Sequence, residues 1–155
     1  MANDDTNDAQ THQQPPEPSP DLKSLGGRLV GTWEVSEGAQ GTAIYEWMEG
    51  GFFLVQRVDL EQHEQSIKDI EIISHERPFG AEPSEDKKSR FYDSAGNTLD
   101  YVYELEGDIL TIWGRERGSP AYYKGNYSAD GDTVSGEWVY PGGGGYRSTM
   151  TRVGE

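Results

Sequence analysis

The chain has 155 residues, with 13 Lys and Arg against 28 Asp and Glu, which gives a formal net charge of -15 at pH 7. This length fits one domain with one hydrophobic core, although only 33% of the residues are hydrophobic. A field this negative repels phosphate backbones and anionic lipid surfaces, so we expect neither nucleic acid nor a membrane as a partner. The sequence has no cysteine, which excludes disulfides and thiol nucleophiles and is consistent with a cytoplasmic location.

The first 20 residues, MANDDTNDAQTHQQPPEPSP, differ in composition from the rest of the chain. They are acidic and proline-rich and contain too few apolar side chains to offset the entropy lost on ordering, so we predict a disordered tail over 1–20 and a single domain over 21–155. This segment has no basic region followed by an apolar run, so we expect no signal peptide. No stretch approaches 18 apolar residues, so we expect no transmembrane helix.

A short helix is predicted at the start of the domain, in SPDLKSLGGRLVG. Ser19 is a suitable N-cap, and Pro20 suits the first helical position. Gly26 and Gly27 weaken the helix and limit it to about two turns. Three leucines are spaced to share one apolar face, with which the helix would lie across another part of the domain: Leu22, Leu25 and Leu29.

From residue 32 onward the sequence predicts about ten short strands, rich in β-branched and aromatic residues. Most connectors are short and contain the Gly, Asn and Asp that hairpin turns need, for example EGG, DSAGN, EGD, ADGD and PGGGG. Ten sequential strands form either a sandwich or a closed up-and-down barrel, and the hairpin spacing favours the barrel because Greek keys need long crossovers. The one long break, ERPFGAEPSEDKK at 76–88, is predicted to be a loop at the barrel rim.

The order of these features resembles the calycin superfamily, which includes the lipocalins and fatty-acid-binding proteins. Gly31-Thr32-Trp33 opens the first strand after a short helix, and Arg152 lies in the last strand. The segments YEWMEGGFFLVQRVD, FYDSAGNTLDYVYEL and YSADGDTVSGEW look more specifically like a bacterial calycin-like family of unknown function, over residues 25–153. The resemblance implies a barrel with an internal cavity, a tryptophan packed at the closed end and an arginine over its ring.

The pair that the resemblance implies is Trp33 with Arg152, and its chemistry is favourable. A guanidinium over an indole is attractive by about 0.5 to 2 kcal/mol. An aromatic ring beside the helix leucines would also seal a barrel end against water. We therefore predict that Trp33 and Arg152 close the barrel and that Trp33 does not contact the ligand.

The direction in which individual side chains point is ambiguous in the stretch FLVQRVD. Because strand side chains alternate between faces, one of Gln56 and Arg57 must point into the barrel. A buried arginine needs a carboxylate partner or an anionic ligand, since an unpaired buried charge is very costly. Partners on neighbouring strands are available in Glu46, Asp69 and Glu71, so both roles stay open for Arg57.

Aromatic residues would line a large cavity or fill a collapsed barrel, and about half of them should face outward. The aromatic residues of the strands include Tyr122 and Tyr123 as well as those in the candidate set. To the aromatic residues we add one cation and one carboxylate from the barrel strands. The candidate ligand-binding residues are Tyr45, Trp47, Arg57, Glu71, Tyr92, Tyr101, Tyr103, Trp113 and Trp138.

We expect no metal and no cofactor. The three histidines, His12, His63 and His75, have no metal-ligand spacing, and His75 is either a surface histidine or an acid or base near the rim. One barrel relative of this superfamily binds haem through a histidine near the carboxyl end, but the last two predicted strands contain none. Asp130 and Asp132 lack the rest of a calcium-loop pattern, PGGGGYRS lacks the lysine of a phosphate loop, and no G-x-S-x-G motif is present.

Three functions are compatible with these features. The first is a barrel that binds a small, largely apolar molecule in its interior. The second is a cofactor-free enzyme of the cyclase or isomerase type, which would use the same cavity and one proton donor or cation such as Tyr101, Glu71 or Arg57. The third is a collapsed barrel that acts through its surface, for example as a homodimer paired edge to edge.

Overall fold

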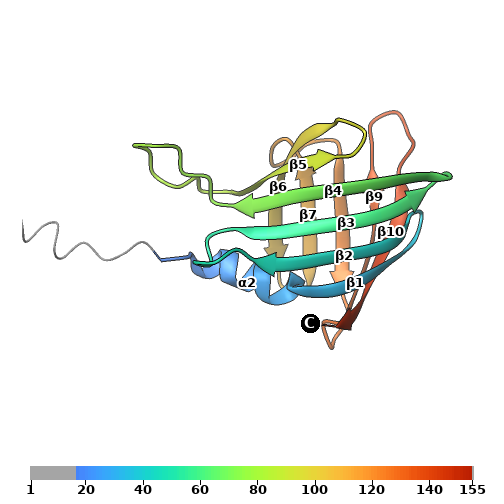
Figure 1. Ribbon diagram of the computed structural model, residues 1–155, viewed down its shortest axis with the longest axis horizontal. Coiled ribbons are helices and arrows are strands. Elements are labelled where there is room, and N and C mark those ends of the chain that lie inside the picture. Colours follow the sequence, from blue (N-terminus) through green and yellow to red (C-terminus); the bar gives the residue numbers. More distant parts are fainter. Residues whose placement is uncertain (1–16, 155) are drawn as a thin grey trace, which may run out of the picture.

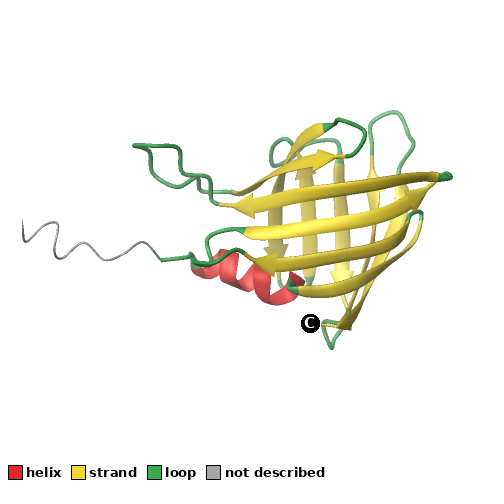
Figure 2. Ribbon diagram, in the orientation of Figure 1, coloured by secondary structure: helices red, strands yellow, loops and turns green. Residues whose placement is uncertain are grey.

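A computed structural model describes residues 17–154 as a closed antiparallel barrel of ten strands with one helix at one end (Figures 1 and 2). The predicted tail falls largely on residues 1–16, which lie outside the described residues. The elements are α2 (Pro20–Leu29), β1 (Gly31–Glu37), β2 (Gln40–Trp47), β3 (Leu54–Gln62), β4 (Gln65–Ser74), β5 (Lys87–Asp93), β6 (Thr98–Glu106), β7 (Ile109–Gly114), β8 (Tyr122–Tyr127), β9 (Thr133–Val139) and β10 (Tyr146–Gly154).

Each strand pairs with the next strand along the chain, and β1 pairs with β10 to close the barrel. The predicted up-and-down barrel is therefore confirmed, and the sandwich is excluded. The sequence predicts about ten strands from residue 32 onward, and the structure has ten, of which the first begins at Gly31. The loop predicted at 76–88 lies between β4 and β5, although its last two residues, Lys87 and Lys88, already belong to β5.

The helix begins as the sequence predicts. The side chain of Ser19 accepts a hydrogen bond from the Leu22 amide at 3.1 Å, and Pro20 is the first helical residue. The helix is ten residues long, about one turn longer than predicted. Its three leucines, Leu22, Leu25 and Leu29, are buried.

The helix is fastened to the connectors at one end of the barrel. Arg28 forms a 2.6 Å ion pair with Asp108, between β6 and β7. Asp21 pairs with Lys87 at 3.2 Å and with His75 at 3.0 Å, on the two sides of the β4–β5 loop. We call this the helix end, and the opposite end, which carries the connectors after β1, β3, β5, β7 and β9, the open end.

Trp33 lies under this helix and is fully buried. Its indole Nε1 donates a 2.7 Å hydrogen bond to the Leu29 carbonyl, and the Arg152 guanidinium lies 4.3 Å from the ring centre. Arg152 also donates to the backbone carbonyls of Val30 and Arg28, the latter at 3.0 Å. One arginine on the last strand thus ties the end of the helix to the first strand.

The inward faces of the strands follow the alternation expected of a barrel. On β3, Leu54, Gln56 and Val58 are buried, whereas Arg57 and Asp59 are exposed. The ambiguity in FLVQRVD is therefore resolved with Gln56 inside. No helix among residues 17–154 has the length and apolarity needed to cross a membrane.

Candidate functional site

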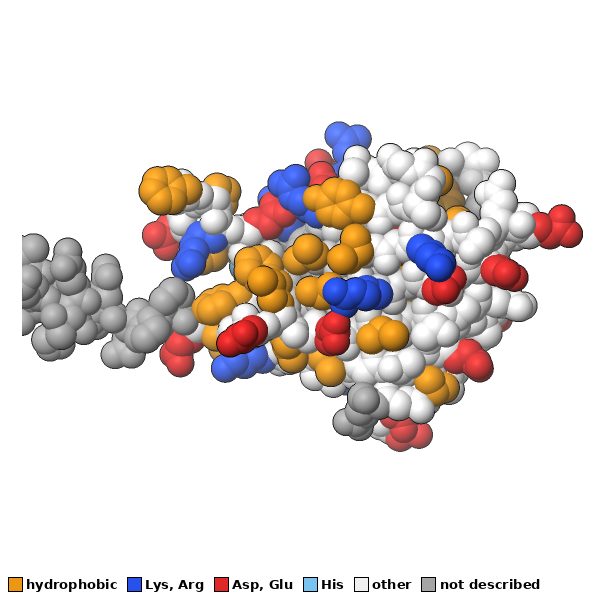
Figure 3. Space-filling view, in the orientation of Figure 1, with side chains coloured by type: hydrophobic (Ala, Val, Ile, Leu, Met, Phe, Trp, Pro, Cys, Tyr) orange, Lys and Arg blue, Asp and Glu red, His pale blue; other side chains and the backbone are white. Residues whose placement is uncertain are grey.

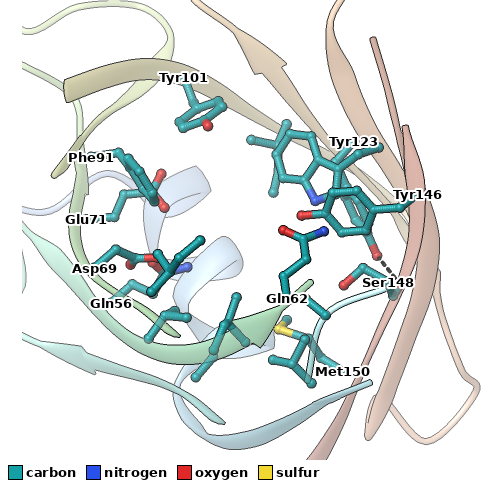
Figure 4. A pocket seen from close by; sticks show the side chains of 18 of the residues that line it. Gln56, Gln62, Asp69, Glu71, Phe91, Tyr101, Tyr123, Tyr146, Ser148 and Met150 are labelled. Carbon is teal, nitrogen blue, oxygen red and sulfur yellow. Dashed lines mark hydrogen bonds between the residues drawn. The ribbon is translucent and has the colours of Figure 1, made fainter. Parts of the chain in front are cut away.

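The barrel encloses a cavity of about 250 Å³ between the helix end and the open end (Figure 4). Lining residues near the helix end, such as Tyr45, Tyr103 and Leu110, are almost completely buried. Lining residues near the open end, such as Gln62 and Tyr140, are partly exposed. The cavity therefore opens at the end opposite α2.

Five of the nine predicted ligand-binding residues line this cavity. They come from strands β2, β4, β6 and β9, and each occupies an inward position of its strand. These five residues are Tyr45, Glu71, Tyr101, Tyr103 and Trp138.

The other four predicted residues were expected to face the ligand, but they lie outside the cavity. Arg57 is exposed and forms a 2.5 Å ion pair with Glu46, the partner on β2 that the sequence offered. Trp113 donates a 3.1 Å hydrogen bond to Glu104, and its ring packs against that of Tyr122, 5.3 Å away between centres.

Tyr92 and Trp47 are also outside the cavity. Tyr92 is exposed on an outward position of β5. Trp47, at the end of β2, is half-buried and packs against the helix. A Cβ atom added to Gly26 would lie 2.0 Å from its ring, so only a glycine allows the helix to approach Trp47 this closely.

The structure adds cavity residues that the sequence did not single out as ligand contacts. The most important are Asp69, two residues before Glu71 on β4, and Gln56 on β3. Others are an amide from β3 and aromatic rings from β5, β8, β10 and the residue that follows β9. The alternation of IKDIEI is the signal for Asp69, since it places the two acidic side chains on one face, but isoleucines on both faces hide which side is inward. The additional residues are Gln62, Phe91, Tyr123, Tyr140 and Tyr146.

Glu71 is the most deeply buried charged group of the cavity, with 3% of its surface exposed. Its Oε2 atom accepts a 2.6 Å hydrogen bond from the Ser89 hydroxyl and a 2.9 Å hydrogen bond from the Tyr103 hydroxyl. Two neutral donors therefore orient this carboxyl. No basic side chain in the described part of the chain forms an ion pair with it.

Asp69 and Glu71 share the Gln56 side chain. When the Gln56 oxygen accepts from the Tyr45 hydroxyl at 2.9 Å, its nitrogen lies 2.7 Å from Asp69 Oδ1 and 3.3 Å from Glu71 Oε1. The reverse orientation would turn the amide oxygen toward both carboxyl groups, so the first orientation is the one that satisfies hydrogen bonding. Figure 4 shows these three side chains together on one wall of the cavity.

The low-polarity surroundings favour the neutral forms of these acids. Burial raises the pKa of Glu71 to about 7, although the hydrogen bonds from Ser89 and Tyr103 oppose this rise. Burial, together with the carboxylates of Glu71 and Asp93, raises the pKa of Asp69 to about 8. The two groups therefore change charge near neutral pH, where few side chains do.

Aromatic rings form the opposite wall of the cavity (Figure 4). The Trp138 ring lies 5.9 Å from that of Tyr101, 5.4 Å from that of Tyr123 and 6.1 Å from that of Tyr140, between ring centres. Phe91 meets Tyr101 edge to face at 6.0 Å. These contacts hold the rings in a continuous surface, which favours a fixed cavity shape.

Comparisons with known proteins add no family or function to this geometry. No family model matches the sequence, and no curated protein is significantly similar to it. The cavity is therefore the feature that points to a function.

Outside the cavity, His75 makes structural contacts. His75 contacts the Ser84 carbonyl at 2.8 Å and Asp21 at 3.0 Å, which fastens the β4–β5 loop to the helix. Burial raises the pKa of Asp21, but hydrogen bonds from Ser19, Lys87 and His75 outweigh this effect and hold the pKa well below its usual range. Among the described residues, no group of three His, Asp or Glu side chains is arranged to hold a metal ion.

The outer surface carries apolar side chains over β2, β3 and β4 (Figure 3). Among the apolar residues of β2, β4, β5 and the β2–β3 connector, Ile44, Ile72, Tyr92 and Phe53 are each about 40% exposed. The third function predicted above required a collapsed barrel, and the cavity of about 250 Å³ removes that premise.

Proposed function

We propose that this protein is a calycin-like barrel that binds a small molecule with a largely apolar body in its interior. The observation that carries this proposal is the cavity of about 250 Å³, which is walled by aromatic rings and open at one end. Ligand pockets are commonly ~300 to 1,000 Å³, so this cavity suits a ligand smaller than a typical drug. Support for the calycin-like assignment comes from the closed barrel, the helix at one end and the contact between Trp33 and Arg152.

Native mass spectrometry of the purified protein tests this function directly. A bound molecule adds mass to the folded protein, and denaturation releases it for identification. A released molecule with an aromatic or aliphatic body would support the proposal. A protein that carries no added mass and also takes up no small apolar probe would contradict it.

An enzyme that uses the same cavity is a second candidate. The observation that favours it is the pair of cavity carboxyls, because a proton donor or acceptor works best when its pKa lies near the working pH. Tyr103 also donates a hydrogen bond to Glu71, so a hydroxyl and a carboxyl are joined at the cavity wall. Incubating the identified ligand with the unmodified protein and with Glu71→Gln tests this candidate. If Glu71 transfers a proton, the unmodified protein should convert the ligand and the variant should not.

A further inference from the structure

The charge of the cavity wall has one sign. Among the residues that line it, Asp69 and Glu71 are acidic and none is Lys, Arg or His. Basic side chains of the described chain pair with acids elsewhere, for example Arg57 with Glu46 and Arg117 with Glu104 and Asp86. An anionic ligand would therefore meet two carboxyl groups and no positive charge in the cavity, which disfavours its binding.

Glu71 is more than nine-tenths buried and has hydrogen-bond donors but no cationic partner. Placing an ionised carboxylate in an apolar interior is costly unless an opposite charge offsets it. The residues that the structure describes supply no such charge, and the free space beside Glu71 and Asp69 is the cavity itself. A positive group in that space would remove the cost.

The Gln56 amide nitrogen indicates how such a group would be held. It lies within hydrogen-bond distance of both Asp69 Oδ1 and Glu71 Oε1, so the two carboxyls converge on one donor. Tyr123 and Tyr146 lie across the cavity from them (Figure 4), and the ring of Trp138 packs against those of Tyr123 and Tyr101. The faces of aromatic rings attract cations, and aromatic walls with nearby carboxylates are suited to ammonium groups.

We propose that the cavity ligand is a small organic cation, an amine or quaternary ammonium whose charge lies beside Asp69 and Glu71 and whose apolar body lies against the aromatic wall. This inference rests on the proposed function and names its ligand class. A bare metal ion fits less well, because the described residues offer no third acidic or histidine ligand and the remaining wall is mostly aromatic and aliphatic.

Three probes of one shape class test the charge preference: benzyltrimethylammonium, its neutral isostere neopentylbenzene, and the anion 3-phenylpropanoate. Calorimetric titration into the full chain should be done at physiological salt or above, because a protein of charge -15 attracts any cation at low salt. We expect the cation to bind at least tenfold more tightly than the neutral isostere. We expect no binding of the anion.

Variants of the two carboxyls locate the effect. Glu71→Gln and Asp69→Asn keep the side-chain shape and should each weaken cation binding by at least tenfold, with less than a threefold change for the neutral probe. Glu137→Gln and Asp59→Asn make the same chemical changes at exposed outward positions of β9 and β3, and both should bind the cation as the unmodified protein does. Circular dichroism confirms that each variant is folded.

The outcomes separate this inference from the proposed function. If neopentylbenzene binds as tightly as the cation, or if the anion binds more tightly, the charge inference is overturned while interior binding stands. If the outer-face variants weaken cation binding as much as the inner ones, the cation is bound by the net charge and the inference is also overturned. If no probe binds and the purified protein carries no molecule, the proposed function fails with it.

Discussion

The guanidinium of Arg152 lies 4.3 Å from the centre of the Trp33 ring, and it donates at the same time to the backbone carbonyls at the end of the helix. Trp33 is fully buried and does not line the cavity. The pair therefore joins α2, β1 and β10 beneath the helix, and the cavity begins beyond it. Trp33 thus has a structural position, whereas Trp138 is the tryptophan that lines the cavity.

Replacing Trp33 with alanine should destabilise the protein by about 3 to 5 kcal/mol, which is the usual cost of truncating a buried tryptophan. The indole hydrogen bond to Leu29 and the contact with Arg152 are lost in the same change. Urea unfolding measures the effect. Binding of a cavity probe, measured where both proteins are folded, should keep its affinity and its order of preference among probes.

Trp113→Ala is the matched control for this variant. Trp113 is half-exposed on the outside of the barrel, so its loss should cost clearly less. Equal costs for the two variants would contradict the structural role of Trp33. A Trp33→Ala protein that melts normally but no longer binds would show that Trp33 is a ligand contact.

Two adjacent helix glycines should respond in opposite directions to alanine. Gly27 has no atom within 4 Å of an added Cβ, so Gly27→Ala should stabilise the protein by about 0.5 to 1 kcal/mol through helix propensity. At Gly26 the same atom would lie 2.0 Å from the Trp47 ring, so Gly26→Ala should destabilise it. Thermal melting of both variants measures the difference, and a Gly26→Ala protein as stable as Gly27→Ala would mean that the helix does not pack on Trp47.

The sequence was sufficient for the fold because its signals are local. Ser19 and Pro20 mark the helix start, and the glycine-containing turns separate runs that can be paired only with their neighbours along the chain. The local sequence around Gly26 indicates only that this residue weakens the helix. Its packing role depends on Trp47, which lies 21 positions away in the sequence, and no local pattern reports such a contact.

The site was predicted less completely, because the inward face of a strand depends on its partners. Arg57 and Gln56 are both polar, and the exposed Glu46 on β2 decides that Arg57 points outward. On β4, isoleucines occupy both faces, since Ile70 and Ile72 lie outside while Ile67 lines the cavity. The pairing of Asp69 with Glu71 in one cavity therefore required the assembled barrel.

Glu71→Gln should stabilise the protein more at high pH than at low pH. The folded-state pKa of Glu71 is raised to about 7, so the folded protein retains a proton that the unfolded chain releases near its ordinary value of about 4.5. Unfolding releases this proton between these two values, so Glu71 lowers stability as the pH rises through that window. We expect the variant to gain on the order of 2 to 3 kcal/mol over the parent between pH 5 and pH 8.

Paired urea titrations at pH 5 and pH 8 measure this gain, with Glu137→Gln as the control for losing one exposed carboxyl. The groups that face Glu71 are Tyr45, Gln56, Ser89 and Tyr103, besides Asp69. Burial raises the pKa of Tyr45 and Tyr103 well above the ordinary tyrosine value, so both stay neutral in this window. An equal gain at both pH values would mean that Glu71 does not titrate in the folded protein as its burial implies.

Cation binding should tighten as the pH rises, and benzyltrimethylammonium reports this cleanly because its own charge is fixed. With the pKa of Glu71 raised to about 7 and that of Asp69 to about 8, the empty cavity holds protons at pH 6 that a bound cation would displace. Binding then releases protons, and affinity should rise at least tenfold from pH 6 to pH 8.5 and level off above it. Glu71→Gln should flatten the lower part of this rise and Asp69→Asn the upper part, whereas Glu137→Gln should leave the whole profile unchanged. An affinity that stays constant or falls over this range would mean that the cavity carboxyls do not hold the charge of the ligand.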